Sequence, residues 1–377
     1  MFSAIMNGLF KDKKDCSSCS ACENVCTKDA ISMQLDSHGF LRPIIDESKC
    51  VKCGICEKRC PWIKQIRSPN CNFEMPVTYA AFAKDTIIRK ESSSGGIFSI
   101  LATEILKQNG AVVGVAQQSE TSFKHIIIRN ESELKLLRGS KYVQANPGLI
   151  YRKTKELLQE NIKVLFSGTP CQIAALYSYL GERHYENLWT TDIVCHGTPS
   201  FILFQKYIHE IETRTKGKVT RSQFRDKSKG WTNFSMSHII QSHNGLISHE
   251  SHPLQEDLFL RLFLSNICLN ETCHDCKYNS IPRLADITLG DFWGVKNFHP
   301  EMDDNMGTSV VLINNSKGDF LFNRIKSQII FHKSELNKAI VRNPCILKSY
   351  PINMQRGSFF KDLDLLSLKN ILEKYKI

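Results

Sequence analysis

The chain has 377 residues, of which 42% are hydrophobic and 23% charged. This composition predicts a folded protein of roughly two or three domains and excludes disorder and collagen. No apolar run approaches the roughly 18 residues of a membrane-spanning helix, so we expect no transmembrane segment. The formal net charge of +11 invites a nucleic-acid partner, but the basic residues are scattered and frame no nucleic-acid-binding module, so we expect none.

The first ten residues, MFSAIMNGLF, contain an apolar run with no basic segment before it and no small-residue cleavage site after it. We therefore expect no secretory signal and a cytoplasmic location. In that reducing compartment the 15 cysteines would stay free thiols, and grouped thiolates become metal ligands.

Two cysteine runs with identical spacing lie within the first sixty residues. Residues 16–26 and 50–60 both read C-x2-C-x2-C-x3-C, and Pro61 follows the second run. Bacterial two-cluster ferredoxins have this spacing, in which three thiolates of each run hold one 4Fe-4S cluster and the fourth reaches the other. Zinc knuckles share C-x2-C, but two complete runs favour clusters. We assign one cluster to Cys16, Cys19, Cys22 and Cys60, and the other to Cys50, Cys53, Cys56 and Cys26.

Residues 1–64 are thus the expected ferredoxin domain, with a hairpin between the two runs that turns at Gly39 and Pro43. Residues 65–76 are rich in Pro, Asn and Ser and are expected to be a linker. Beyond them the periodicity is α/β. Strands are expected at 80–85, 111–117, 125–130, 163–168 and 188–197, and helices at 97–110, 172–181 and 201–214. This order predicts an open mixed sheet covered by helices.

Two turns at expected helix starts could bind phosphate. SSSGG at 92–96 precedes one helix, and GTPCQ at 168–172 follows a strand. Small residues at a helix N-terminus leave backbone N–H groups free for an anion, although ordinary capping gives the same pattern. Cys171 in the second turn could also be a low-pKa nucleophile, but no histidine at a fixed spacing accompanies it.

A second group of cysteines lies late in the chain. Cys268, Cys273 and Cys276 occur in NICLNETCHDCKY, and Cys195 ends the expected strand in DIVCHG. Four thiols suffice for a third 4Fe-4S cluster. Zinc on the same thiols, or a buried Cys195 that only packs, are the alternatives.

Several strings in order resemble the coenzyme F420 hydrogenase/dehydrogenase beta subunit family: SSSGGIFSILATEIL, LRGSKYVQA, VLFSGTPCQIAAL, DIVCHGTPS, FRDKSKGW, and CHDCKY through ADITLGDFWGV. The resemblance runs from about Tyr79 to Phe298. That family couples a bound FAD to a 4Fe-4S cluster, and many members carry or partner with a two-cluster ferredoxin module. The resemblance therefore implies a third cluster on Cys195, Cys268, Cys273 and Cys276.

The resemblance also implies which residues contact the flavin. Lys141 would offset diphosphate charge, and Tyr142 would stack or hydrogen-bond. The residues implied to line the FAD site are Ser94, Gly95, Gly96, Lys141, Tyr142, Gln144, Gly168, Thr169, Pro170, Cys171 and Gln172. The expected fold is an α+β two-cluster ferredoxin domain followed by an α/β mixed-sheet flavin-binding domain. The latter would comprise an N-terminal part (77–160), a C-terminal part with the flavin and cluster sites (161–335) and a helical extension (336–377).

By resemblance, the chain would be an iron–sulfur flavoprotein oxidoreductase. Electrons would pass between the ferredoxin clusters, the third cluster and FAD, with hydride exchange to a deazaflavin such as coenzyme F420 or to another small acceptor. The expected partners are a redox protein or ferredoxin and a small hydride donor or acceptor. The alternatives are a non-catalytic electron-transfer subunit of a larger redox complex and a redox enzyme serving polysaccharide biosynthesis. The sequence identifies no catalytic side chain and no direction of electron flow.

Overall fold

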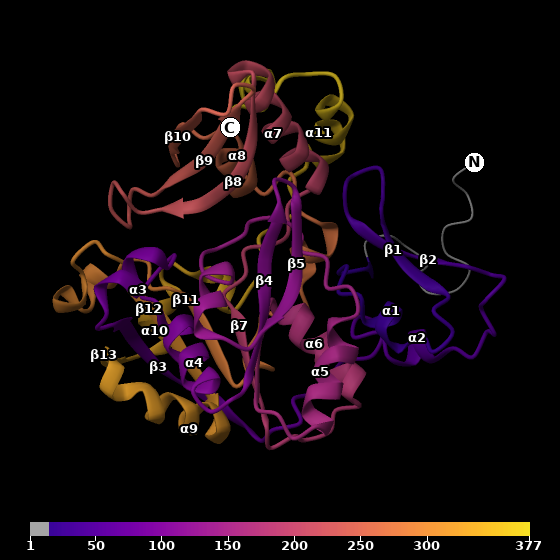
Figure 1. Ribbon diagram of the computed structural model, residues 1–377, viewed down its shortest axis with the longest axis vertical. Coiled ribbons are helices and arrows are strands. Elements are labelled where there is room, and N and C mark those ends of the chain that lie inside the picture. The colour runs from indigo at the N-terminus through magenta and orange to yellow at the C-terminus, as the bar shows by residue number, and fades with distance from the viewer. Residues whose placement is uncertain (1–14) are drawn as a thin grey trace.

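The structure is a computed structural model that describes residues 15–377, shown in Figure 1. The expectation about a secretory signal concerns residues outside this range. Within it, every helix is too short or too polar to cross a bilayer.

The ferredoxin region is a small hairpin flanked by two short helices. Its elements are α1 (Ala21–Val25), β1 (Ile31–Leu35), β2 (Leu41–Ile45) and α2 (Ile55–Lys58). The strands pair antiparallel, with Ile31 opposite Ile45. The turn between them uses Gly39, whose φ of 79° is left-handed and favours glycine. The predicted hairpin is therefore confirmed, but Pro43 is not part of its turn, since it lies in β2 opposite Met33.

The centre of the molecule is an eight-stranded sheet in the order β13-β3-β12-β11-β7-β6-β4-β5. Strands β4, β6, β7 and β11 run parallel to one another, and the remaining neighbours are antiparallel. The predicted mixed sheet is confirmed. The strands are β3 (Asn72–Ala83), β4 (Ala111–Ser119), β5 (Ser122–Ile128), β6 (Val164–Gly168), β7 (Leu188–Ile193), β11 (Ile287–Asp291), β12 (Ser309–Asn315) and β13 (Ile329–Ser334).

Helices cover both faces of this sheet. On one face, α4 (Ile97–Leu106) and α9 (Ser316–Ile325) pack with strand residues such as Val112, and on the other α5 (Ile150–Gln159) and α6 (Pro170–Leu180) pack with residues such as Val113. Strands buried on both faces need apolar residues at consecutive positions, which explains the run AVV in β4.

Strand β3 begins earlier than the sequence predicts, inside the expected linker 65–76. Asn72 pairs with Asn315 in the sheet. The Asn70 amide donates to Asp286 Oδ1 at 2.6 Å, and the Asn72 amide donates to the Arg283 carbonyl. These polar side chains are typical of a linker by composition, but here they satisfy buried groups at the base of the sheet.

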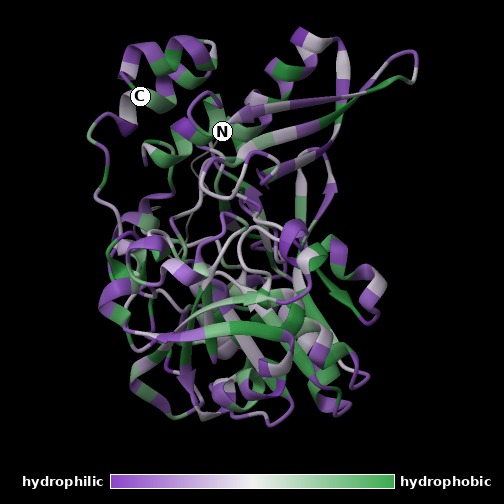
Figure 2. Ribbon diagram, turned by 90° about the vertical axis from the view of Figure 1, so that its left-hand side faces the viewer, coloured by the Kyte–Doolittle hydropathy of each residue, from purple (hydrophilic) through white to green (hydrophobic). Residues whose placement is uncertain are grey.

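A second sheet and the C-terminal helices lie at one end of the large sheet (Figure 1). This sheet has the order β10-β9-β8. In Figure 2 the C-terminal helices show purple and green residues in alternation, as expected for amphipathic helices with one face on the core. The remaining elements are α3 (Thr86–Glu91), α7 (Phe201–Thr215), β8 (Gly217–Asp226), β9 (Ser235–Ser242), β10 (Ile247–Pro253), α8 (Leu258–Leu264), α10 (Leu336–Ile340), α11 (Arg356–Leu363) and α12 (Leu368–Tyr375), with short 3-10 turns between some of them.

Candidate functional site

A cavity of about 310 Å³ opens at the carboxyl ends of the parallel strands. Gly168 at the end of β6, Ile193 at the end of β7 and Asp291 at the end of β11 line it. Open α/β sheets bind ligands at this edge, and the volume falls in the range of small-molecule sites.

The cavity brings together most of the residues that the resemblance implies for a flavin. Gly95 and Pro170 are not among the lining residues. A Cβ on Gly95 would lie 2.4 Å from the Ala81 carbonyl oxygen, so this glycine lets the chain pass close to β3. The predicted residues that do line the cavity are Ser94, Gly96, Lys141, Tyr142, Gln144, Gly168, Thr169, Cys171 and Gln172.

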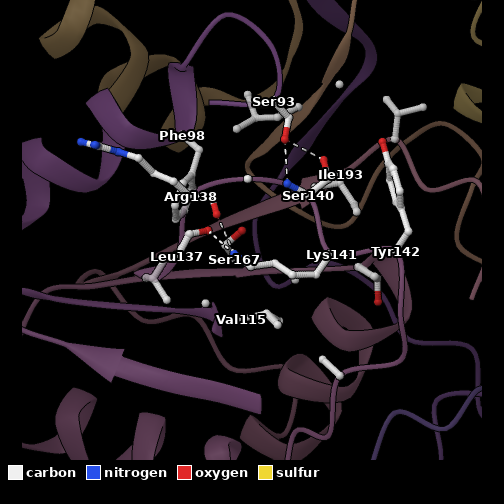
Figure 3. Close-up of a pocket in the computed structure, with 18 of the residues that line it drawn as sticks. Ser93, Phe98, Val115, Leu137, Arg138, Ser140, Lys141, Tyr142, Ser167 and Ile193 are labelled. Carbon is white, nitrogen blue, oxygen red and sulfur yellow. Dashed lines mark hydrogen bonds between the residues drawn. The ribbon is translucent and has the colours of Figure 1, made fainter. Parts of the chain in front are cut away.

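The serine loop, residues 92–96, is fixed on two sides. The Ser140 backbone N–H donates to Ser93 Oγ at 2.6 Å, as Figure 3 shows, and Ser94 Oγ donates to the Thr308 carbonyl at 3.0 Å. Gly96, with a φ of 84°, begins α4. The loop therefore presents the start of a ten-residue helix to the cavity in one defined conformation.

Lys141 lines the cavity, and its ammonium is bound by backbone carbonyls. Its ammonium donates to the carbonyls of Leu137 at 2.9 Å and Arg138 at 2.8 Å (Figure 3). Burial lowers the pKa of Lys141 to about 7. Tyr142 stacks on Phe263 with ring centroids 5.1 Å apart. In this conformation Lys141 braces the wall of the cavity.

Arg225 is a residue at this site that sequence reasoning missed. Its buried guanidinium binds both carboxylate oxygens of Asp291, at 2.9 and 3.2 Å, and donates to the Ser93 carbonyl at 3.3 Å. Trp231 Nε1 also donates to Asp291, at 2.8 Å. The strings FRDKSKGW and GDFWG contributed to the resemblance, but nothing in their spacing shows that their side chains meet. Arg225 and Trp231 together fix the Asp291 carboxylate, which lines the cavity.

Four thiols of the ferredoxin region form a buried set, which we call the inner group. Burial raises the pKa of Cys22, and three neighbouring thiols raise it further. Ser18 and Ser20, on either side of Cys19, both have left-handed backbone, with φ of 61° and 60°. The Ser18 N–H donates to Cys16 Sγ at 3.4 Å. This all-thiol donor set with N–H···S contacts fits a 4Fe-4S cluster. The inner group is Cys16, Cys19, Cys22 and Cys60.

The other four predicted ferredoxin ligands form the outer group. Lys52 and Gly54 flank Cys53 with the same left-handed backbone, at φ of 53° and 69°. Cys53 is exposed, and its thiol lies close enough to raise the pKa of Cys56, which burial also raises. The backbone thus follows the same path in both runs. The outer group is Cys50, Cys53, Cys56 and Cys26, all at least partly exposed.

A third set of thiols meets beside the cavity. Burial and the Cys273, Cys276 and Cys345 thiols raise the pKa of Cys195. Burial and the Cys276, Cys19 and Cys195 thiols likewise raise the pKa of Cys171. The Thr198 N–H donates to Cys273 Sγ at 3.3 Å. We call Cys171, Cys195, Cys273 and Cys276 the third group. Its donor set also fits a 4Fe-4S cluster.

Cys268 lies elsewhere, although the resemblance implies that it belongs to this set. Its side chain is fully buried among residues of α7, α8 and the C-terminal helices, and its thiol lies 3.5 Å from the Leu262 carbonyl. Burial raises its pKa to about 12, and the charge of Arg356 lowers it. The raised pKa of Cys171 also argues against the alternative of a low-pKa nucleophile.

The inner and third groups adjoin each other. The Tyr151 hydroxyl donates to the Cys19 carbonyl at 2.8 Å, and the Tyr278 hydroxyl donates to the Pro61 carbonyl. Burial raises the pKa of Tyr278, and the thiols of Cys19 and Cys171 raise it further. One buried region therefore contains thiols of both groups.

Three comparisons place the chain among known proteins. Models described as "Coenzyme F420 hydrogenase/dehydrogenase, beta subunit" match residues 78–149 (N-term) and 162–339 (C terminus), and a "4Fe-4S dicluster domain" model matches residues 15–63. An uncharacterized protein of Methanocaldococcus jannaschii is 25% identical over 197 residues, which is 45% of this chain and 54% of that protein. The chain thus spans about half the length of this curated relative. In the F420-reducing [NiFe] hydrogenase complex from Methanosarcina barkeri, one chain is 16% identical with a TM-score of 0.48, and the match covers 82% of this chain and 95% of that one.

Proposed function

The chain belongs to the coenzyme F420 hydrogenase/dehydrogenase beta subunit family, and we propose that it is an iron–sulfur flavoprotein oxidoreductase. One observation carries the proposal: a small-molecule cavity at the carboxyl end of a parallel sheet lies directly beside buried groups of thiols. A protein that only relays electrons between partners needs clusters but no such cavity. The cavity therefore favours an enzyme over a bare electron-transfer subunit.

The residues of the cavity fit a flavin. Bound there, FAD would supply the exchange between one-electron carriers and a two-electron hydride acceptor. The serine loop and the start of α4 would hold its phosphates by backbone N–H groups. At α6 the Thr169 N–H already donates to Gln172 Oε1 at 2.9 Å, so this turn would line the site without binding phosphate through that group. Arg225 holds Asp291 and the serine loop together, so it would orient the wall against which the ligand rests.

The third group would hold the third 4Fe-4S cluster. We assign its fourth thiolate to Cys171 in place of Cys268, because Cys171 lies with Cys195 and Cys276 while Cys268 packs in another core. Cys171 also lines the cavity. Cys171 would then contact both the flavin site and the cluster site.

The proposal is tested by anaerobic purification followed by assays of iron, sulfide and flavin. We expect about twelve irons and one flavin for each chain. Reduced ferredoxin should then reduce a deazaflavin or another small acceptor. Iron without flavin would favour the electron-transfer subunit, and chains that bind flavin but reduce no acceptor would contradict the catalytic part of the proposal.

The ligand assignment has its own matched pair of variants. Cys171→Ala should lower the iron content from about twelve to about eight atoms per chain, whereas Cys268→Ala should leave it unchanged. Electron paramagnetic resonance of the dithionite-reduced proteins should show one cluster signal fewer in Cys171→Ala alone. Loss of iron in Cys268→Ala and not in Cys171→Ala would support the ligand set implied by the resemblance, which contains Cys268.

A further inference from the structure

The ferredoxin region itself forms part of the wall of the cavity. Ser17 and Ser18 lie between the first two cysteines of residues 16–26, which we call the inner run, and they line the cavity together with residues of the large sheet. Ser17 also hydrogen-bonds toward the Cys19 thiol. The loop that would wrap one corner of a cluster therefore faces the ligand cavity.

This loop is fixed to the rest of the chain by residues distant in sequence. The Arg42 guanidinium donates to the Cys16 carbonyl and to Asn270 Oδ1, the latter at 3.1 Å. Thr272 Oγ1 donates to the same Cys16 carbonyl at 3.4 Å, and the Ser18 hydroxyl donates to the Leu41 carbonyl at 2.6 Å. The loop is thus held on the side that faces the third group.

The ferredoxin hairpin binds the cavity wall directly as well. The Leu41 N–H donates to Gln144 Oε1 at 2.9 Å, and Gln144 lines the cavity. On the other side of the loop, Tyr151 holds the Cys19 carbonyl. A shift of the loop would therefore move or open one wall.

We propose that the inner run, when its cluster is assembled, forms one wall of the flavin site, so that flavin binding depends on assembly of that cluster. This inference rests on the proposed function. Ser18 and Ser20 have a left-handed backbone that serine disfavours, and ligation of Cys19 between them would add to the hydrogen bonds that hold it. Loss of the cluster would remove that additional restraint from the wall.

Residues 50–60, which we call the outer run, supply a matched control. Val51 occupies the position after the first cysteine, as Ser17 does in the inner run, but it is 60% exposed and does not line the cavity. The same substitution therefore changes the cavity wall at Ser17 but only a solvent-facing loop at Val51.

The first test compares Ser17→Tyr with Val51→Tyr in the full-length, cluster-loaded protein. Both variants should keep the iron content of the wild type. Titration with FAD, followed by flavin fluorescence, should show binding weakened at least tenfold in Ser17→Tyr and unchanged in Val51→Tyr. Equal binding by both variants would overturn the assignment of the wall.

The second test removes the clusters one at a time. Cys19→Ser and Cys53→Ser should each lose about four irons, but flavin should be lost in Cys19→Ser alone. Circular dichroism establishes that both chains are folded. If both folded variants keep flavin, or both lose it, the dependence on the inner cluster is wrong. A wild-type chain that binds no flavin would instead contradict the proposed function.

Discussion

The inner and outer cysteine runs have the same spacing and the same backbone but opposite surroundings. Each run carries a left-handed residue on both sides of its second cysteine. Yet Cys19 is 8% exposed, whereas Cys53 is freely exposed. Local sequence therefore specifies the loop that can wrap a cluster. Whether the cluster is buried depends on residues such as Tyr151 and Asn270, more than a hundred positions away.

This difference suggests separate tasks for the two clusters. The outer group faces solvent, where a redox partner can approach it. The inner group adjoins Cys171 and the cavity. We expect electrons to enter or leave through the outer cluster and to exchange with the buried centres through the inner one.

The largest expected contrast comes from removing the third cysteine of each run. Cys22 is buried in the core that the ferredoxin region shares with α5 and α6, while Cys56 packs against its edge. Cys22→Ala should lower the free energy of unfolding by about 4 kcal/mol or more, the size that loss of a metal site can reach. Cys56→Ala should lower it much less. Anaerobic denaturant titration measures both, and equal losses would contradict the comparison.

Metal removal should distinguish the groups by rate. The outer thiols are partly exposed, so a chelator or dissolved oxygen should reach that cluster first. We expect about one third of the iron to leave at least tenfold faster than the rest. The iron absorbance after addition of the chelator records the two phases. A single phase would show that burial does not protect the inner cluster.

Arg152 joins the outer group to the large domain. Its guanidinium donates to the Asn24 carbonyl at 2.8 Å and to the Cys26 carbonyl at 2.6 Å. Arg152→Ala should cost about 1–3 kcal/mol, because two partly buried carbonyls lose a charged donor. Lys155→Ala on the same helix is the control. The Lys155 ammonium lies 5.8 Å from the centre of the Tyr179 ring, within the large domain, so this variant removes a positive charge without changing a contact to the ferredoxin region. Thermal unfolding of both variants, compared with the wild type, measures the difference.

The smallest expected difference in stability concerns the residues that have a left-handed backbone. Lys52→Gly should stabilise the chain by up to about 1 kcal/mol, because glycine adopts this backbone without steric cost. Ser18→Gly gains the same backbone freedom but loses the hydrogen bond to the Leu41 carbonyl, so it should not stabilise. Denaturation midpoints that rise equally in both variants would mean that this bond contributes nothing.

The sequence predicted what depends on local spacing. The two cysteine runs, the hairpin between them, the mixed sheet and the small-residue turns before α4 and α6 all follow from patterns within short windows. Cys268 lies five residues before Cys273, and the resemblance implies it as a cluster ligand. Its side chain instead follows the end of α8 into a different core. Local sequence patterns do not show that Cys171 lies near Cys195, because the pairing of strands β6 and β7 brings the two residues together.

Contacts between distant segments were equally hidden from the sequence. Arg225 and Asp291 meet across 66 positions, and Ser17 reaches the cavity only because the ferredoxin region docks on the large domain. The resemblance implies a phosphate contact for Lys141, and the structure places this residue in the cavity lining. Its hydrogen bonds to the Leu137 and Arg138 carbonyls could not be read from the sequence.

The early start of β3 defines where the two modules can be exchanged between proteins. A fusion cut at residue 77 would leave behind Asn72, which pairs with the end of β12, and Asn70, which binds Asp286. The transplanted ferredoxin would carry away part of the central sheet of its host. The functional junction therefore lies before Ser68, and a designed chimera that swaps electron-entry modules should join its partners there.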